Sequence, residues 1–500
     1  MSQASPHYQQ YVTEMRKIAD IRYASAVLQW DQETYLPAKG ADFRGQQIAT
    51  LSSLAHEFFT SQKMGQLLKT LSEEDGLTED QRANVVLSLQ DYERHSKIPT
   101  DLVERMSVAV HKSFHSWMKG RQENDFSVFA PDLSEILQLK KEESTLLGYE
   151  KNPYDAHLND HDKGSSVALL DQIFTNLKPA LKSILDKILT KPEVEDGFLR
   201  QHFPKNQQWE FGIQVLKDMG YDFEAGRQDV SEHPFTINFN SKDVRVTTRI
   251  DEQDFSNMLW SCIHEGGHAL YEQALPEAEY GLPLSEAASF SVHESQSRLW
   301  ENQVGRSWEF CQHYFPILKE LFPKQFAGIS TEEFYKAINK VSPSLIRTEA
   351  DELTYHFHVM IRYEIEKLLF DGAISVHDIP EYWNAHYESY LGVAVPDHKR
   401  GCLQDVHWSH GSFGYFPTYS LGSMYGAQFY TQAATEIPLL STYIRNGSFQ
   451  PLLQWLNGKV HIWGRKYDSE SLSLKISGKG LDPSIFTAYL LDKYMNIYNI

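Results

Sequence analysis

The residues with the clearest chemical potential are two histidines and a glutamate in the run Ile263-His264-Glu265-Gly266-Gly267-His268. On a helix, His264 and His268 lie about one turn apart on the same face. Two imidazoles in that arrangement can bind one divalent metal ion, and the adjacent glutamate can act as a general base. The run therefore predicts a hydrolytic metal centre with Glu265 as the base. The alternative is a pair of core histidines on an amphipathic structural helix.

The residues around this run predict the helix that would carry the centre. Asp251 or Asp254 can cap its N-terminus, and an apolar stripe precedes the motif. Gly266 and Gly267 cost the helix about 1 kcal/mol each relative to alanine. A purely structural helix gives no reason for this cost, so we expect another strand or a ligand to approach the glycines closely.

A catalytic zinc site needs a third protein ligand and an open coordination position. About 25 residues further on, His293-Glu294-Ser295-Gln296 falls in a second predicted helix. From spacing alone, either His293 or Glu294 fits as the ligand. A carboxylate from the next helix is the common arrangement in HExxH hydrolases, so we prefer Glu294. The alternatives are a solvent-facing charge for Glu294 and a hydrogen-bond partner outside the ligand set for His293.

Helical periodicity dominates the chain and predicts a mainly α fold. It indicates helices over 8–30, 43–70, 79–95, 102–119, 133–147, 167–189, 209–219, 254–273, 284–303, 332–341 and 345–370. Residues 234–250 differ, because apolar and polar side chains alternate on either side of a turn sequence, which predicts a β-hairpin. Residues 401–426 are rich in Gly, Ser, Tyr, Phe and His and are predicted to form an ordered functional loop.

Composition excludes several classes of protein. The 500 residues are 41% hydrophobic, enough for a sizeable core. Lys and Arg total 47 against 67 Asp and Glu, a formal charge of −20 that argues against a nucleic-acid partner. There is no apolar run of about 18 residues, so we expect no membrane-spanning helix. The first residues lack a signal peptide's apolar stretch, and the three cysteines form no CxxC pair, so we expect a cytoplasmic protein.

Five motifs resemble the carboxypeptidase Taq family of metallocarboxypeptidases. They are Asp243-Val-Arg245-Val-Thr247, His264-Glu265-Gly-Gly-His268, His293-Glu294-Ser295-Gln296, Ile346-Arg347-Thr-Glu-Ala350-Asp351 and Gly401-Cys-Leu-Gln404-Asp405-Val-His407-Trp408. Further similar residues near both ends extend the resemblance over essentially the whole chain. We therefore predict one metallocarboxypeptidase domain over residues 1–500, with the metal site built from about 234–420.

The resemblance implies a large, mostly helical HExxH metallopeptidase with a small β-sheet and a deep groove, similar to neurolysin-like peptidases. It implies release of single C-terminal residues from peptides, with broad specificity except before proline. It implies one Zn²⁺ per chain, for which Co²⁺ can substitute, and a homodimer. By resemblance, Glu294 is the third ligand, and Glu265 activates the metal-bound water. We expect the hairpin to line the groove.

A carboxypeptidase must also recognise the free α-carboxylate of its substrate. Arginine suits this task, because its planar fork offers paired donors and a permanent charge. Arg347 is the leading candidate, since Asp351 and Tyr355 follow it at helical spacing and its motif borders the groove in the family. The alternative is an ordinary ion pair between Arg347 and Asp351. Arg245 and Arg249 in the hairpin are weaker candidates.

The tetrahedral intermediate of peptide hydrolysis needs a hydrogen-bond donor besides the metal. In related helical peptidases a histidine and a tyrosine from one aromatic loop have this role, and His410 and Tyr419 have a similar separation here. Tyr415 is a rival of Tyr419, and His407 is a candidate contact for the substrate carboxylate. Aromatic packing within an ordered loop is the alternative for each of the four.

Two other functions fit the same residues. A helical zinc endo-oligopeptidase would share the metal site but would not require a free carboxyl terminus. A non-catalytic peptide-binding protein would hold a structural metal or none. Cleavage of peptides with and without a free C-terminus separates the first alternative, and loss of activity in Glu265→Gln separates the second.

Overall fold

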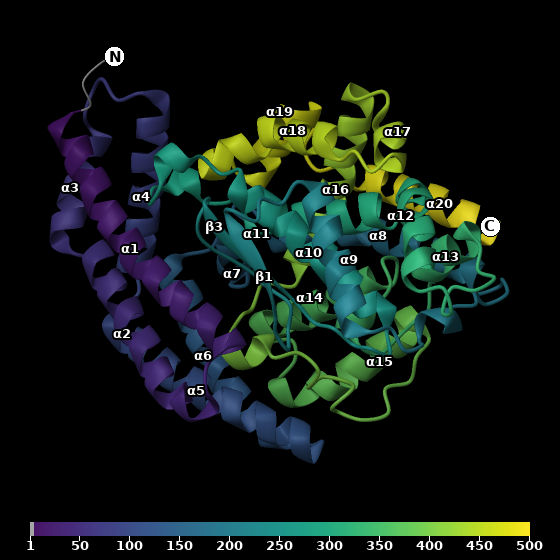
Figure 1. Ribbon diagram of the computed structural model, residues 1–500. Coiled ribbons are helices and arrows are strands. Elements are labelled where there is room, and N and C mark those ends of the chain that lie inside the picture. Colours follow the sequence, from purple (N-terminus) through teal and green to yellow (C-terminus); the bar gives the residue numbers. More distant parts are fainter. Residues whose placement is uncertain (1–4) are drawn as a thin grey trace. The chain divides into compact units, whose positions relative to one another are not determined.

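The computed structural model describes residues 5–500, which form two compact units. Unit 1 contains residues 5–96, 195–338 and 425–480. Unit 2 contains residues 97–194, 339–424 and 481–500. The predicted mainly α fold with a small β-sheet is confirmed, since most elements in Figure 1 are helices. No helix of the described residues is long and apolar enough to cross a bilayer.

Unit 1 holds the only sheet among the described residues, together with most of the helices. Its helices are α1 (Pro6–Thr34), α2 (Ala41–Phe59), α3 (Gln62–Ser72), α4 (Glu79–Ser96), α9 (Lys205–Met219), α10 (Phe255–Gln273), α11 (Phe290–Arg298), α12 (Trp308–Leu321), α13 (Thr331–Ile338), α17 (Leu440–Arg445), α18 (Gln450–Lys459) and α19 (Ser469–Ser477). Its strands are β1 (Gly226–Val230), β2 (Thr236–Asn240) and β3 (Asp243–Thr248). A π-helical segment, Leu299–Gly305, continues directly from α11.

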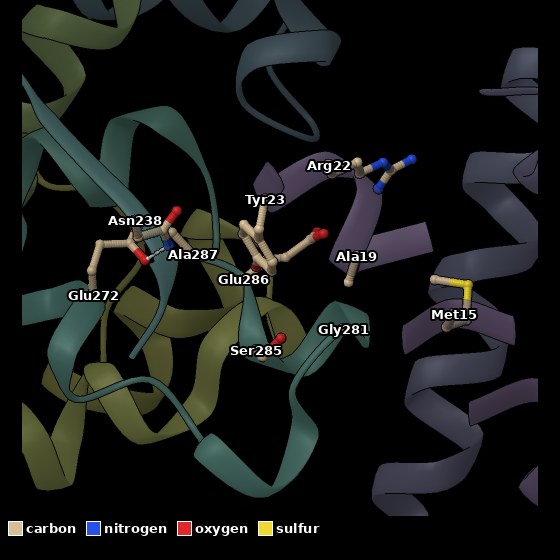
Figure 2. Close-up of a pocket in the computed structure, with 10 residues that line it drawn as sticks. All are labelled: Met15, Ala19, Arg22, Tyr23, Asn238, Glu272, Gly281, Ser285, Glu286 and Ala287. Atoms are coloured by element: carbon tan, nitrogen blue, oxygen red, sulfur yellow. Dashed lines mark hydrogen bonds between the residues drawn. The ribbon is translucent and has the colours of Figure 1, made fainter. Parts of the chain in front are cut away.

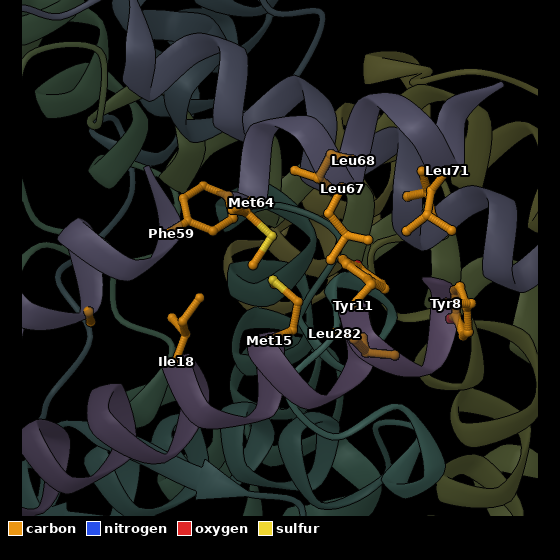
Figure 3. Packing of buried hydrophobic residues seen from close by; sticks show 12 residues of the cluster. Tyr8, Tyr11, Met15, Ile18, Phe59, Met64, Leu67, Leu68, Leu71 and Leu282 are labelled. Atoms are coloured by element: carbon orange, nitrogen blue, oxygen red, sulfur yellow. The ribbon is translucent and has the colours of Figure 1, made fainter. Parts of the chain in front are cut away.

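The first helices of unit 1 pack around one apolar cluster. Figure 3 shows Tyr11 and Met15 of α1 facing Met64, Leu67 and other apolar side chains of α3. The predicted single helix over 43–70 is wrong in one respect, because the chain breaks between α2 and α3. The Ser61 hydroxyl accepts a hydrogen bond from the backbone N–H of Met64 and begins a new helix.

The sheet has the strand order β1-β3-β2. Strands β2 and β3 pair antiparallel, which confirms the predicted hairpin. Strand β1 pairs in parallel with β3 and was not predicted, because Gly-Arg-Gln-Asp-Val carries no apolar alternation. Both β2 and β3 contact α10, so the hairpin lies against the helix that carries the metal motif.

Unit 2 is helical. Its helices are α5 (Thr100–Glu123), α6 (Ala130–Leu147), α7 (Asp155–His161), α8 (Val167–Ile188), α14 (Tyr355–Asp371), α15 (Ile379–Leu391) and α20 (Pro483–Tyr498). A further helix, α16 (Pro417–Glu436), begins in unit 2 and ends in unit 1. Loop residues near its start belong to the region that was predicted to carry function.

Three predicted boundaries are wrong, each for a local reason. Helix α11 begins at Phe290 and not at residue 284, because the Ser289 hydroxyl caps it. Helix α14 begins at Tyr355 and not at residue 345, because Asp351 accepts hydrogen bonds from the backbone N–H groups of Leu353 and Thr354. The predicted loop over 401–426 ends at Pro417, which begins α16 with the fixed φ that suits a first helical position.

Candidate active site

The metal motif lies on α10, as predicted, with Asp254 as the N-cap. Gly267 explains how a second helix reaches the motif. A Cβ atom at Gly267 would lie 2.7 Å from the carbonyl oxygen of Gln296 and from Cα of Ser297, which are backbone atoms of α11. The predicted close approach is thus made by a helix. Because α11 also carries Glu294, this contact sets the distance between Glu294 and the two histidines.

Three donor side chains converge where α10 meets α11. Nε2 of His264 lies 3.7 Å from Oε2 of Glu294, and Nε2 of His268 lies 3.5 Å from the same oxygen. One ligand atom from each of the three residues lies within 4.8 Å of the others. Tetrahedral ligands at zinc bond lengths near 2.0–2.1 Å are separated by about 3.3 Å, so the donors are close to the required spacing. The structure completes the group with Glu294 and not with His293.

Hydrogen bonds fix two of these donors. Nδ1 of His264 donates to Oε2 of Glu301 at 2.9 Å, which leaves Nε2 available to a metal. Nε of Arg298 donates to Oε1 of Glu294 at 2.7 Å, which leaves Oε2 towards the histidines. His264 and Glu294 are therefore each oriented by a charged neighbour.

The electrostatics of the site suit a cation. Although burial opposes it, Arg298 and His264 hold the pKa of Glu294 far below its usual range. Burial and the nearby His293 lower the pKa of His268 to about 3, which keeps that imidazole neutral. Burial opposes protonation of His264, but the carboxylates of Glu294 and Glu301 raise its pKa overall. One carboxylate and two imidazoles in this setting fit a divalent metal ion.

Glu265 is buried beside these donors. The Thr236 hydroxyl on β2 donates to its Oε2 at 2.6 Å, so the hairpin orients the carboxylate. Burial raises the pKa of Glu265 from its usual value towards neutral pH, which makes the carboxylate a better proton acceptor. A carboxylate held in this way is suited to accept a proton from water.

A cavity of about 280 Å³ is lined by residues of α1, β2, α10 and the segment 281–287 (Figure 2). Asn238 on β2 and Glu272 on α10 line one side, and a hydrogen bond joins the Asn238 amide to the Glu272 carboxylate. Tyr23 of α1 lies opposite them. Glu272 follows His268 by one helical turn, so the cavity begins one turn from a ligand. Asn238 is the hairpin residue in this lining, and the expectation that the hairpin lines the substrate groove stays a prediction.

Arg245 is engaged within unit 1. Its Nε and Nη2 both donate to the Asp243 carboxylate at 2.9 Å. Its guanidinium lies 4.4 Å from the ring centroid of Trp30 and 4.9 Å from that of Phe239. These contacts give the Asp243-Val-Arg245 motif a structural role in the hairpin. Arg249, the other hairpin candidate, directly follows β3.

The leading candidate for substrate recognition, Arg347, lies in unit 2. The Arg347 side chain is 6% exposed, and its Nε and Nη2 donate to Oδ1 of Asp405 at 3.0 and 2.9 Å. Its Nη1 donates to the Tyr355 hydroxyl at 3.0 Å. Arg362 binds the other Asp405 oxygen, Oδ2. The expected alternative partner, Asp351, instead accepts hydrogen bonds from the backbone N–H groups of Leu353 and Thr354, just before α14, so the fourth and fifth motifs meet through Arg347 and Asp405.

Three of the aromatic candidates pack together beside Arg347, and the fourth, His410, packs elsewhere in unit 2. The Arg347 guanidinium lies 5.0 Å from the Tyr419 ring centroid, and Tyr419 packs edge-on against Tyr415 at 5.3 Å. The His407 ring lies 5.6 Å from that of Tyr415, and burial and Arg347 lower the His407 pKa to about 4. The His410 ring instead stacks on Phe114 of α5 at 5.3 Å.

Sequence reasoning missed the residues that orient the predicted site. Glu301 follows Glu294 by seven residues, or about two helical turns, and that spacing was a usable signal. Arg298 follows Glu294 by four residues and was equally visible. Thr236 could not be assigned, because its contact with Glu265 depends on how the hairpin packs on α10.

A helical fold in which an HExxH helix is completed by a glutamate from the next helix defines a metallopeptidase of the HExxH class. The chain matches the family model described as Carboxypeptidase Taq (M32) metallopeptidase over residues 10–494. It is 40% identical over 486 residues to Carboxypeptidase 1 of Bacillus subtilis, with 97% of each chain covered. It is 38% identical over 506 residues to Thermostable carboxypeptidase 1 of Thermus thermophilus, which covers 98% of this chain and 99% of that one.

Solved structures agree with these matches. The crystal structure of an M32 carboxypeptidase from Deinococcus radiodurans superposes with a TM-score of 0.97 at 38% identity, covering 99% of this chain and 100% of the other. The chain therefore belongs to the carboxypeptidase Taq (M32) family of metallopeptidases. It is a metal-dependent carboxypeptidase, a hydrolase that acts on peptides.

Proposed function

We propose that this protein is a zinc-dependent carboxypeptidase that releases single C-terminal residues with broad side-chain specificity, except before proline. The observation that carries the proposal is the convergence of His264, His268 and Glu294 beside the buried carboxylate of Glu265. The proposed metal is one Zn²⁺ per chain, with Co²⁺ as a working substitute.

Each residue at the metal site has a defined part. His264, His268 and Glu294 hold the metal, which when bound lowers the pKa of water and polarises the peptide carbonyl. Glu265 takes the proton of the attacking water and passes it to the leaving amine. The Thr236 hydroxyl holds Glu265 in position, and the raised pKa of Glu265 suits both proton transfers.

Recognition of the substrate carboxyl terminus is assigned to Arg347. A guanidinium has five N–H groups, and three of them are engaged by Asp405 and Tyr355. The other two can bind the terminal carboxylate while Asp405 keeps the arginine in place. His407 and Tyr415 are proposed as additional substrate contacts. Arg245 is a weaker candidate, because Asp243 already occupies its paired donors.

His410 and Tyr419 are proposed to donate hydrogen bonds to the oxyanion of the tetrahedral intermediate. Tyr419 lies in the cluster that surrounds Arg347, which supports a role near the substrate. We further propose a single functional domain over residues 1–500, a homodimer and a cytoplasmic location. These three proposals rest on the sequence and the family resemblance.

The test compares one unblocked peptide with its C-terminally amidated twin by mass spectrometry over time. Zinc-loaded protein should remove residues one at a time from the free peptide only, and a chelator should stop the reaction. Peptides with penultimate and terminal proline probe the proline limit. Arg347→Lys should raise KM for the free peptide by roughly 10-fold or more, because a lysine lacks the paired donors.

Other outcomes would redirect the proposal. Internal cleavage of both peptides would contradict the carboxylate requirement and indicate an endo-oligopeptidase. Absence of cleavage with zinc and with cobalt would indicate a non-catalytic peptide-binding protein. A tenfold or larger rise in KM in Arg245→Lys, with KM unchanged in Arg347→Lys, would assign the carboxylate contact to Arg245 on the hairpin.

A further inference from the structure

The two histidine ligands are supported differently. Nδ1 of His264 donates to Glu301, the usual outer contact of a metal-binding histidine. Nδ1 of His268 is buried and has no hydrogen-bond partner among the described residues. No Nδ1 hydrogen bond to the described residues therefore fixes the plane of the His268 ring, although a metal ligand must be held in a defined orientation.

A third histidine lies flat against the His268 ring. The ring centroids of His293 and His268 are 4.3 Å apart, and the ring planes differ by only 19°. His293 comes from α11, directly before the ligand Glu294. The stacked pair therefore joins the two helices that supply the three donors.

His293 is itself anchored on the other side. Its Nε2 donates to Oε1 of Glu272 at 2.8 Å. The Asn238 amide on β2 donates to the second oxygen of the same carboxylate. Glu272 is 8% exposed, and each of its two carboxylate oxygens accepts one of these hydrogen bonds. The His293 ring therefore cannot rotate without breaking a buried hydrogen bond.

We propose that His293 is a positioning residue that fixes the orientation of the metal ligand His268 by ring stacking, in place of a hydrogen bond. The inference rests on the proposed metal site. It assigns the histidine of the third motif a role outside the ligand set, with Glu272 and Asn238 as its anchors. His293 is outside the group of donors formed by His264, His268 and Glu294, and its Nε2 is hydrogen-bonded to Glu272.

Two substitutions separate the ring from the hydrogen bond. His293→Phe keeps a flat ring against His268 and loses the contact with Glu272. His293→Gln keeps a side-chain donor for Glu272 and loses the ring. Competition with a chromophoric chelator gives the Zn²⁺ dissociation constant of each variant, and the visible absorption of the Co²⁺ form reports the ligand geometry. Neither readout depends on peptide cleavage.

We expect the Zn²⁺ dissociation constant to depend on whether residue 293 carries a flat ring, and not on its hydrogen bond to Glu272. His293→Phe should stay within about threefold of the wild type and keep the Co²⁺ spectrum, whereas His293→Gln should bind roughly 10-fold or more weakly and shift the spectrum. Tyr271→Phe keeps the 5.7 Å ring contact with His293 and loses only the hydrogen bond that the hydroxyl accepts from the backbone N–H of Ala288, so as a control it should change neither readout. Circular dichroism of the metal-free variants checks that all of them fold.

The reverse order would overturn the inference: a wild-type constant in His293→Gln together with a loss in His293→Phe would assign the effect to the hydrogen bond. Equal, unchanged constants in both variants would also overturn it. If the wild type binds no divalent ion, the metal site and this inference fail together. If the metal binds but no peptide is cleaved, only the proposed function fails.

Discussion

A single methyl group on α10 should separate the metal ligands. In Gly267→Ala the new Cβ would lie 2.7 Å from two backbone atoms of α11, at Gln296 and Ser297. Backbone atoms cannot rotate aside as a side chain can, so the two helices must move apart. Glu294 lies on the displaced helix, two residues before Gln296.

The size of the displacement follows from the contact distance. Ordinary contact begins near 3.4 Å, so relief of a 2.7 Å approach needs a shift of about 0.7 Å. Metal–ligand distances tolerate about 0.2 Å, so the carboxylate would be drawn well out of range. Overpacking costs about 1–3 kcal/mol, and the better helix propensity of alanine returns about 1 kcal/mol. The variant should therefore fold, with a loss of unfolding free energy of roughly 0–2 kcal/mol.

The assay compares metal binding with stability in two neighbouring variants. Gly267→Ala should raise the Zn²⁺ dissociation constant by at least about 10-fold, measured by chelator competition. Gly266→Ala is the control, because its Cβ would approach Leu216 Cδ2 at 2.6 Å and Met219 Cε at 3.2 Å, the ends of flexible side chains. We expect that variant to bind zinc within about threefold of the wild type, since α11 need not move.

Wild-type zinc affinity in a folded Gly267→Ala variant would refute the reasoning, since it would show that the α10–α11 spacing does not set the site. An equal loss in Gly266→Ala would also count against it, because that residue does not face α11.

Three further predictions concern side chains in the two units. Glu265→Gln should lower kcat by about 10³-fold or more and leave the zinc dissociation constant within about threefold, which would separate proton transfer from metal binding; a matching loss of zinc would contradict the assignment. Glu301→Gln should weaken zinc binding by roughly 10-fold, because His264 loses its charged acceptor, and an unchanged constant in chelator competition would contradict this. Burial raises the pKa of Glu366 from 4.5 to about 7, so the folded protein retains a proton that the unfolded chain releases. The stability contribution of Glu366 is therefore complete below pH 4.5 and is lost as pH rises through 7, a change of roughly 3 kcal/mol. Urea unfolding of metal-free protein at pH 5 and pH 8 should show this part of the pH dependence in the wild type and not in Glu366→Gln.

The metal donors could be predicted from sequence because their geometry is local. His264 and His268 are placed by one helical turn, and α10 needs only its own periodicity and cap to form. The second helix left both His293 and Glu294 open as the third ligand, and Glu294 was preferred because a carboxylate from the next helix is the common arrangement in HExxH hydrolases. The two glycines even predicted a close approach, although not that a helix would make it.

The surroundings of Arg347 could not be predicted in the same way. Helical spacing suggested Asp351 as its partner, but Asp351 accepts hydrogen bonds from the backbone N–H groups of Leu353 and Thr354, and Arg347 lies in the separate turn Arg347–Glu349. Its actual partner, Asp405, is 58 residues away in sequence. Periodicity carries no information on contacts of that range, which depend on how the helices of unit 2 pack.

The central claim, that His264, His268 and Glu294 form one catalytic metal site, is tested most directly by titrating metal-free protein with Zn²⁺ while C-terminal residue release is followed. We predict that activity rises linearly and stops rising at one equivalent of zinc per chain, and that Glu294→Ala stays inactive over the same range. Full activity in the thoroughly chelated protein, or wild-type activation of Glu294→Ala at one equivalent, would contradict the account.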